Sequence, residues 1–172
     1  AVAALRLSSL PTVLWWRGGR PDTLDGLVDL AERIVLDDEA PEPIWARAAT
    51  LFEGSAFSDL RWARLTQWRA LMAHFFDIPE VLAAATDFSR LTITASDRMA
   101  ARLFAAWLQS SLPFQPGFTV EYAEGSTSAL IDEVRLADHE QQLVIRLSAH
   151  RTCLETEVSV QGHRSASRLV AL

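Results

Sequence analysis

The chain has 172 residues, 49% of them apolar, which is enough to build a sizeable core without disulfides or structural metals. Its formal net charge is −6, every basic residue is an arginine, and there is no basic block, so nucleic acid is not an expected partner. A single cysteine, Cys153, cannot form an internal disulfide, and no apolar run reaches the roughly 18 residues of a membrane span. We therefore expect a cytoplasmic protein with no membrane partner.

The first part of the sequence predicts strands that alternate with a helix. A short apolar run, Val13 to Trp16, ends at Gly18-Gly19 and indicates a buried strand entering a turn. Pro21 favours a helix start, and apolar residues at helical spacing extend this helix to about Glu32. The segment RIVL, residues 33–36, predicts a second strand. This β-α-β succession favours parallel pairing of the two strands.

The middle of the chain is mainly helical by its periodicity. The expected elements are helices over Ile44–Phe52, Asp59–Phe76 and Glu80–Ala85, a strand over Leu91–Thr94, and a helix over Asp97–Ser110. Ser96 is the expected cap of the last helix, and Asp59 or Ser58 that of the long one. In the last helix, Ala105 is expected to face water.

The remainder of the chain changes from helical to alternating periodicity. Four segments, at 118–122, 130–136, 143–147 and 154–160, place apolar residues at every second position and predict an antiparallel meander with one buried face. Their charged residues fall on the opposite face, where cross-strand pairing is expected. Residues 165–172 are expected to form a short helix. The predicted fold is α/β (α+β), a single domain over 1–172 with one mixed sheet and helices packed on it.

No catalytic or metal site is indicated by the sequence. The four histidines lack ligand spacing, and neither a CxxC nor an HExxH motif occurs. Cys153 lies near His150, but both are expected to face solvent with no third group to orient the base. The pair Asp37-Asp38 is expected to be solvated. We therefore expect a protein that is not an enzyme and needs no cofactor.

Gly18-Gly19 leaves one alternative open. Arg17 and Arg20 flank this pair after a strand, so a small α/β ligand-binding domain or enzyme with an anion site here is conceivable. A phosphate-binding loop needs further glycines at set spacing, and these are missing. A plain turn is the favoured interpretation.

Tryptophan and arginine gather in two segments, residues 11–17 and 59–76. These hold four of the six tryptophans and four of the sixteen arginines. On a helical wheel of 59–76, Arg61, Arg64 and Arg69 fall on the same broad side as Trp62 and Trp68. Either the arginine stems pack along the core with their heads meeting acids such as Asp59, or the first half of this helix faces a partner.

The same two segments resemble a known family. LPTVLWWRGG followed by DLRWARLTQWRALMAHFFD is similar to the glucose-6-phosphate dehydrogenase assembly protein family, known as OpcA, which shows an L-P-x-x-x-W-W-x-G segment and then an acidic-L-x-W-x-R-L-T-x-W-R segment. The resemblance spans most of the chain. Longer members carry a region before the first segment, so this chain is expected to lack it.

The resemblance implies a non-catalytic protein that binds glucose-6-phosphate dehydrogenase in the oxidative pentose phosphate pathway, as an assembly factor or allosteric activator. It implies no catalytic residues, and with one cysteine a dithiol switch within this chain is impossible. From the motif and from the hot-spot preference for these residue types, the expected partner-binding residues are Trp15, Trp16, Arg17, Arg61, Trp62, Arg64, Trp68 and Arg69.

Overall fold

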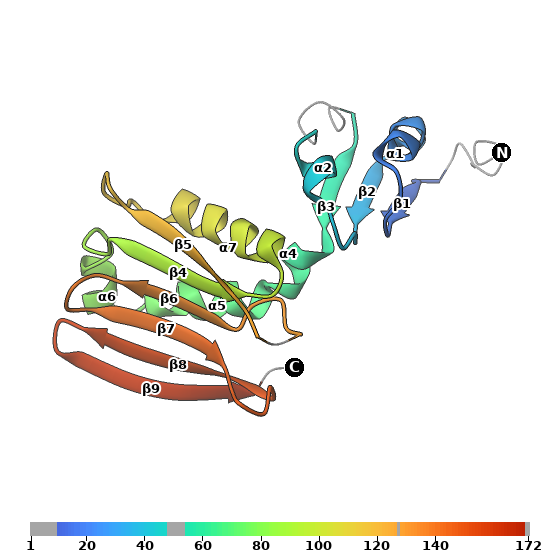
Figure 1. Ribbon diagram of the computed structural model, residues 1–172. Helices are drawn as coiled ribbons and strands as arrows, with labels where there is room; N and C mark the ends of the chain where they lie inside the picture. Colours follow the sequence, from blue (N-terminus) through green and yellow to red (C-terminus); the bar gives the residue numbers. More distant parts are fainter. Residues whose placement is uncertain (1–9, 48–53, 127, 171–172) are drawn as a thin grey trace. The chain divides into compact units, whose positions relative to one another are not determined.

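The computed structural model describes residues 10–47, 54–126 and 128–170. The chain divides into two compact units, residues 1–64 and 65–172, each with its own sheet and its own hydrophobic core (Figure 1). The structure therefore shows two compact units, and a single domain over 1–172 remains a prediction.

The first unit is a small parallel α/β layer. Its elements are β1 (Val13–Trp16), α1 (Pro21–Val28), β2 (Arg33–Leu36), α2 (Glu42–Trp45), β3 (Ala56–Asp59) and α4 (Leu60–Arg64). The strands lie in the order β1-β2-β3, and both pairings are parallel. The expected parallel pairing of the first two strands is confirmed.

One face of this sheet is covered by helices. Trp16, Ile34 and Leu36 point to the same face and pack in one cluster with Leu24 of α1 and Ile44 of α2. Val13 and Trp15 alternate with these residues and point to the other face, where both are exposed. Parallel sheets are usually covered on both faces, so an exposed indole here is unusual.

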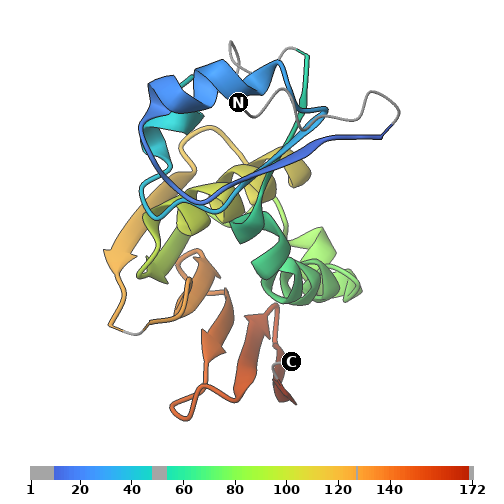
Figure 2. The same cartoon turned by 90° about the vertical axis from the view of Figure 1, so that its right-hand side faces the viewer.

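The second unit is a helix-covered, mostly antiparallel sheet. It contains α5 (Thr66–Phe75), α6 (Pro79–Ala83), β4 (Arg90–Ala95), α7 (Arg98–Ser111), β5 (Thr119–Glu124), β6 (Glu133–Ala137), β7 (Gln142–Leu147), β8 (Cys153–Val160) and β9 (His163–Val170). The strand order is β5-β4-β6-β7-β8-β9. Figure 2 shows α5 and α7 on the same side of this sheet.

A single apolar cluster lies between these helices and the sheet. The fully buried Phe104 of α7 and Met72 of α5 pack with Ile93, Val134 and Ile145, which the strand register places on one face. The opposite face is polar and carries the expected cross-strand ion pairs. In two of these, Nη2 of Arg146 on β7 lies 2.7 Å from Oε2 of Glu157 on β8, and Nη2 of Arg168 on β9 lies 2.5 Å from Oε1 of Glu155 on β8.

The mixed α/β class is confirmed, with a β-α-β front half and helices packed on strands. The strands form two sheets rather than one mixed sheet. β1, β2 and β3 pair only with one another in the described part of the chain, and each sheet covers its own apolar cluster.

The prediction of one long helix over 59–76 is wrong at both its start and its middle. Residues 56–59 form β3, which pairs with β2, and the helical run breaks at the fully buried Leu65 into α4 and α5. Asp59 does occupy the expected cap position, because its Oδ1 accepts a hydrogen bond from the backbone N–H of Arg61 at 2.8 Å.

Two predictions about the back half are also wrong. The segment at 118–122 belongs to β5, which pairs parallel with β4 instead of opening an antiparallel meander. Residues 165–172 do not form a helix, since β9 runs from His163 to Val170 and pairs antiparallel with β8. Gln161 and Gly162, with φ of 47° and 82°, supply the two-residue turn that makes this hairpin.

Smaller differences concern ends and faces of elements. Helix α1 ends at Val28 rather than near Glu32, and Asp97, not Ser96, caps α7 by accepting the backbone N–H of Ala100 at 2.9 Å. Ala105 is buried against the sheet. Cys153 is buried at the start of β8 rather than exposed. The predicted helix at 44–52 is described only as α2, because residues 48–53 lie outside the described residues.

Candidate functional site: a tryptophan and arginine surface

The carboxyl ends of the three parallel strands bring together most of the predicted residues. In a parallel sheet these ends lie at one edge, which is where functional groups of α/β folds usually gather. The residues at this edge are Trp16 at the end of β1, Arg17 after it, Asp37 and Asp38 after β2, Asp59 from β3, and Arg61, Trp62 and Arg64 from α4.

A buried ion pair forms the base of this edge. Arg61 is only 5% exposed, and its Nη1 lies 3.6 Å from Oδ1 of Asp59, while its Nη2 donates to the carbonyl oxygen of Asp38 at 2.5 Å. The other carboxylate oxygen of Asp59 accepts the indole N–H of Trp45 at 2.9 Å. The prediction that an arginine head meets Asp59 is confirmed, and this pair ties α2, β3 and α4 together.

The second buried group is Trp16. Its indole Nε1 donates to Oδ2 of Asp38 at 3.1 Å, so the end of β1 is fastened to the loop after β2. The φ angles of Gly18 and Gly19 are 117° and 139°, values that side chains rarely allow. A Cβ at Gly19 would also lie 3.1 Å from the Trp16 ring. The packing of this indole therefore explains Gly19, while Gly18 is explained by its φ angle.

The electrostatics of the loop oppose the alternative of an anion site. A Cβ on Gly18 would lie 3.6 Å from Oδ1 of Asp38, so a carboxylate already faces the turn. Both arginines that flank the turn are near carboxylates: Nε of Arg17 lies 3.9 Å from Oδ2 of Asp37, and Nη2 of Arg20 lies 3.3 Å from Oδ2 of Asp22. An incoming phosphate would meet like charge on this side of the loop.

Beside these buried groups lies a row that we name the Trp15–Arg64 surface, consisting of the exposed Trp15, Arg17 and Arg64 and the half-buried Asp37. The Arg17 guanidinium carbon lies 5.2 Å from the centroid of the Trp15 ring, which is cation–π distance, and Trp15 is 57% exposed. Oδ2 of Asp37 lies 3.9 Å from Nε of Arg17, and Oδ1 of Asp37 lies 3.1 Å from Nη2 of Arg64. One carboxylate thus pairs with both guanidinium groups, and that of Arg17 lies over an exposed indole.

The other predicted residues divide between exposed and buried positions. Trp62 of α4 is 37% exposed, whereas Trp68 of α5 is 8% exposed and belongs to the core of the second unit with Met72. Arg69 is half-buried, donates from Nη2 to Oγ1 of Thr66 at 3.2 Å, and has its pKa lowered by burial. Trp68 and Arg69 belong to the second unit.

Sequence reasoning missed the role of Asp37 and Asp38, which we expected to be solvated. The signal that could have found them is their position directly after a strand of a parallel sheet, where they meet groups from neighbouring strand ends. In the described ranges, 10–47, 54–126 and 128–170, no group of three or more potential metal ligands occurs. The helices within these ranges are all too short or too polar to cross a membrane.

These features define a mixed α/β protein with an exposed aromatic and cationic surface at the ends of a parallel sheet. Residues 55–172 match the family described as the C-terminal domain of the OpcA glucose-6-phosphate dehydrogenase subunit, and the chain belongs to this family. The match includes β3, α4 and the second unit, and it begins after Trp15, Trp16 and Arg17.

A relative from Nostoc punctiforme, whose name refers to the OxPP cycle and to OpcA, is 31% identical over 153 residues. The aligned region covers 83% of this chain and 32% of the relative. The chain thus spans about a third of the length of the relative that it matches. The resemblance noted from the sequence is confirmed at the level of the family.

Proposed function

We propose that this protein is a non-catalytic partner of glucose-6-phosphate dehydrogenase, an assembly factor or allosteric activator in the oxidative pentose phosphate pathway. The description of its family as a domain of a dehydrogenase subunit supports this proposal, as does the OxPP cycle in the name of the relative. The observation that carries it is the exposed Trp15 with Arg17 over its ring. Tryptophan and arginine are the residue types most enriched in interface hot spots.

The Trp15–Arg64 surface is suited to contact because its side chains are held in place. Asp37 fixes the two guanidinium groups, so less side-chain entropy is lost when a partner binds. In this proposal Trp15, Arg17, Trp62 and Arg64 contact the dehydrogenase, while the buried Trp16 and Arg61 support them from beneath. The complementary patch on the dehydrogenase is apolar with carboxylates at its rim.

Binding raises the activity of an enzyme only when the partner prefers the active state. The proposed mechanism is therefore a population shift: this protein binds the assembled, active form of the dehydrogenase more tightly than other forms. Such a shift predicts that dehydrogenase activity rises with the concentration of this protein until all of the dehydrogenase is bound. If the active form is scarce without this protein, the increase in activity persists at high substrate concentration.

The test combines affinity with kinetics. The Kd for the dehydrogenase is measured for the natural protein and for Trp15→Ala, Trp62→Ala and Arg64→Ala, and dehydrogenase velocity is measured against glucose 6-phosphate with and without each of them. A hot-spot residue contributes at least about 2 kcal/mol, so Kd is expected to rise about thirtyfold for Trp15→Ala or Arg64→Ala. The concentration of this protein that gives half-maximal activation should rise in the same proportion.

Two matched controls separate binding from folding. Leu82→Ala removes an exposed apolar side chain and Arg102→Ala an exposed arginine, both in the second unit, and neither should change Kd. Melting temperatures should stay near that of the natural protein for all variants. Unchanged Kd in Trp15→Ala and Arg64→Ala would refute the surface, and no binding by the natural protein would refute the proposed function.

A further inference from the structure

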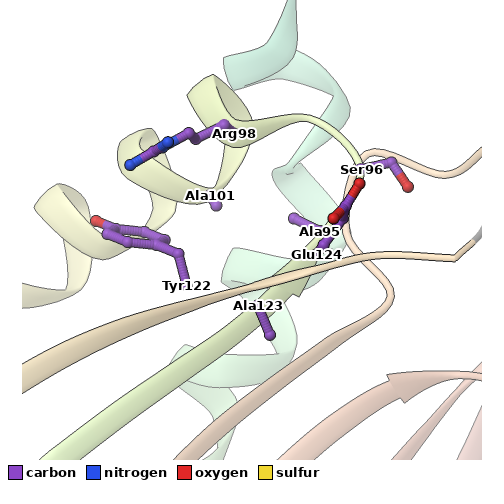
Figure 3. Close-up of a pocket in the computed structure, with 7 residues that line it drawn as sticks. All are labelled: Ala95, Ser96, Arg98, Ala101, Tyr122, Ala123 and Glu124. Carbon is purple, nitrogen blue, oxygen red and sulfur yellow. The ribbon is translucent and has the colours of Figure 1, made fainter.

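A cavity of about 330 Å³ lies in the second unit at the carboxyl ends of two parallel strands (Figure 3). β4 and β5 pair in register up to Ala95 and Glu124, and α7 connects them along the chain. The lining residues are Ala95, Ser96, Arg98, Ala101, Tyr122, Ala123 and Glu124. This is the position at which α/β units bind ligands, and the volume lies at the lower end of small-molecule sites.

The cavity has small residues and a fixed backbone at its base. Ala95 and Ala101 are buried in the core cluster, so the floor is part of the folded interior. Next to it, a Cβ at Gly125 would lie 2.6 Å from Oδ2 of Asp132 and 2.7 Å from the backbone carbon of Ala95. Only glycine allows this close approach, and the end of β5 is therefore held against the end of β4.

Three charged or aromatic side chains line the cavity, and all three are exposed to solvent. In the part of the chain that the structure describes, the side chains of Arg98, Tyr122 and Glu124 form no hydrogen bond or ion pair. Figure 3 shows Arg98 extending from α7 above Tyr122, with Glu124 beside Ser96. The cavity thus offers one cation, one carboxylate, a phenol ring and small apolar surface.

We propose that this cavity binds a small zwitterion of the amino-acid class. The Arg98 guanidinium would bind the carboxylate of the ligand and the Glu124 carboxylate its ammonium group, while the Tyr122 ring covers the carbon skeleton. A ligand with a single charge can pair with only one of the two lining charges, whereas a zwitterion pairs with both, and this favours zwitterions over simple anions and simple amines. The proposal does not depend on binding of a dehydrogenase.

The test uses the fact that Tyr122 is the single tyrosine of the chain. Protein labelled with 3-fluorotyrosine gives one ¹⁹F resonance, which reports directly on the cavity. The probes are L-alanine, L-leucine, L-glutamine and 4-aminobutanoate, which share a carboxylate and an ammonium group but differ in spacing and side chain. The tightest of them is then compared with its analogues that lack the amine or the carboxylate.

The expected result is a saturable shift with at least one zwitterion and binding roughly 10- to 100-fold weaker for each singly charged analogue, as for loss of a charge-assisted hydrogen bond. Arg98→Ala should weaken binding of the zwitterion to a similar extent and Glu124→Gln should do so too. Arg102→Ala, one turn along α7 and outside the cavity, should bind as the natural protein does. No saturable shift with any probe, or equal binding by Arg98→Ala, would overturn the proposal.

Discussion

Removing the Asp59 carboxylate is expected to destabilise the first unit severely. In Asp59→Ala the guanidinium of Arg61 stays almost fully buried without its carboxylate, and the indole N–H of Trp45 loses its acceptor. Breaking a buried ion pair from one side costs about 3–5 kcal/mol, and an orphaned buried donor about 1–3 kcal/mol. Arg61 keeps its bond to the Asp38 carbonyl, so we expect a loss of about 4 kcal/mol.

A cost of this size is a large share of the stability of an ordinary domain. Removing both members of the ion pair should cost much less than removing one, because replacing both partners by apolar groups is often nearly neutral for stability. We therefore expect the double variant Asp59→Ala, Arg61→Leu to lose much less than the sum of the two single variants. The coupling free energy from this cycle should be about 2 kcal/mol or more, as for residues in direct contact.

The assay is urea unfolding followed by the indole N–H resonances of isotopically labelled protein. Trp45 reports on the first unit, and Trp68 and Trp107 report on the second. In Asp59→Ala the Trp45 resonance should shift and its hydrogen exchange should accelerate. An unchanged Trp45 transition, or costs of Asp59→Ala and Arg61→Leu that simply add, would show that the ion pair does not hold this unit together.

Two further stability predictions concern single backbone positions, each measured as the free energy of unfolding in urea. Gly19→Ala should cost about 1–3 kcal/mol, because φ is 139° and the new Cβ would press on the Trp16 ring. Gly26→Ala should instead stabilise the protein by about 0.5–1 kcal/mol, because Gly26 lies in α1 and a new Cβ there would meet no other part of the protein within 4 Å. Equal effects of the two substitutions would contradict the packing explanation. Asp97→Ala should cost about 1 kcal/mol through loss of the α7 cap, and a larger cost for Ser96→Ala would restore the assignment made from sequence.

The predictable part of the fold is the part encoded locally. The alternation of apolar residues in 130–136 and 143–147 fixes which side chains point inward, and Val134, Leu143 and Ile145 are buried as expected. The short run at β1 and the segment RIVL at β2 likewise carry enough apolar character to be identified as strands. Pairing of β1 with β2 then follows from the intervening helix.

The elements that were missed depend on partners distant in sequence. β3 has four residues, is followed at once by a helix, and is a strand because β2 lies beside it. Residues 164–169 of β9 are exposed on both faces and show no alternation of apolar and polar residues, so this strand is identified by its pairing with β8. Tertiary context decides such segments more than propensity does.

The sequence predicted which residue types form the site, but not which of these residues are buried and which are exposed. Neutralisation of a buried arginine by Asp59 follows from the cost of an unpaired charge, and this pair exists. Adjacent strand residues must face opposite ways, but which of Trp15 and Trp16 is buried depends on the side of the sheet that α1 and α2 cover. The role of Asp37 was missed for a similar reason, because the sequence does not show which side chains lie next to the end of β2.

The strand that closes the larger sheet has a consequence for solubility at high concentration. Among the strands that the structure describes, β9 lies at the edge of its sheet, and such an edge invites a second chain to add to it and start a polymer. If two copies of β9 met antiparallel about Ala166, Arg164 of one would stand opposite Arg168 of the other. This repulsion between like charges disfavours that pairing of two copies while leaving the hairpin with β8 intact.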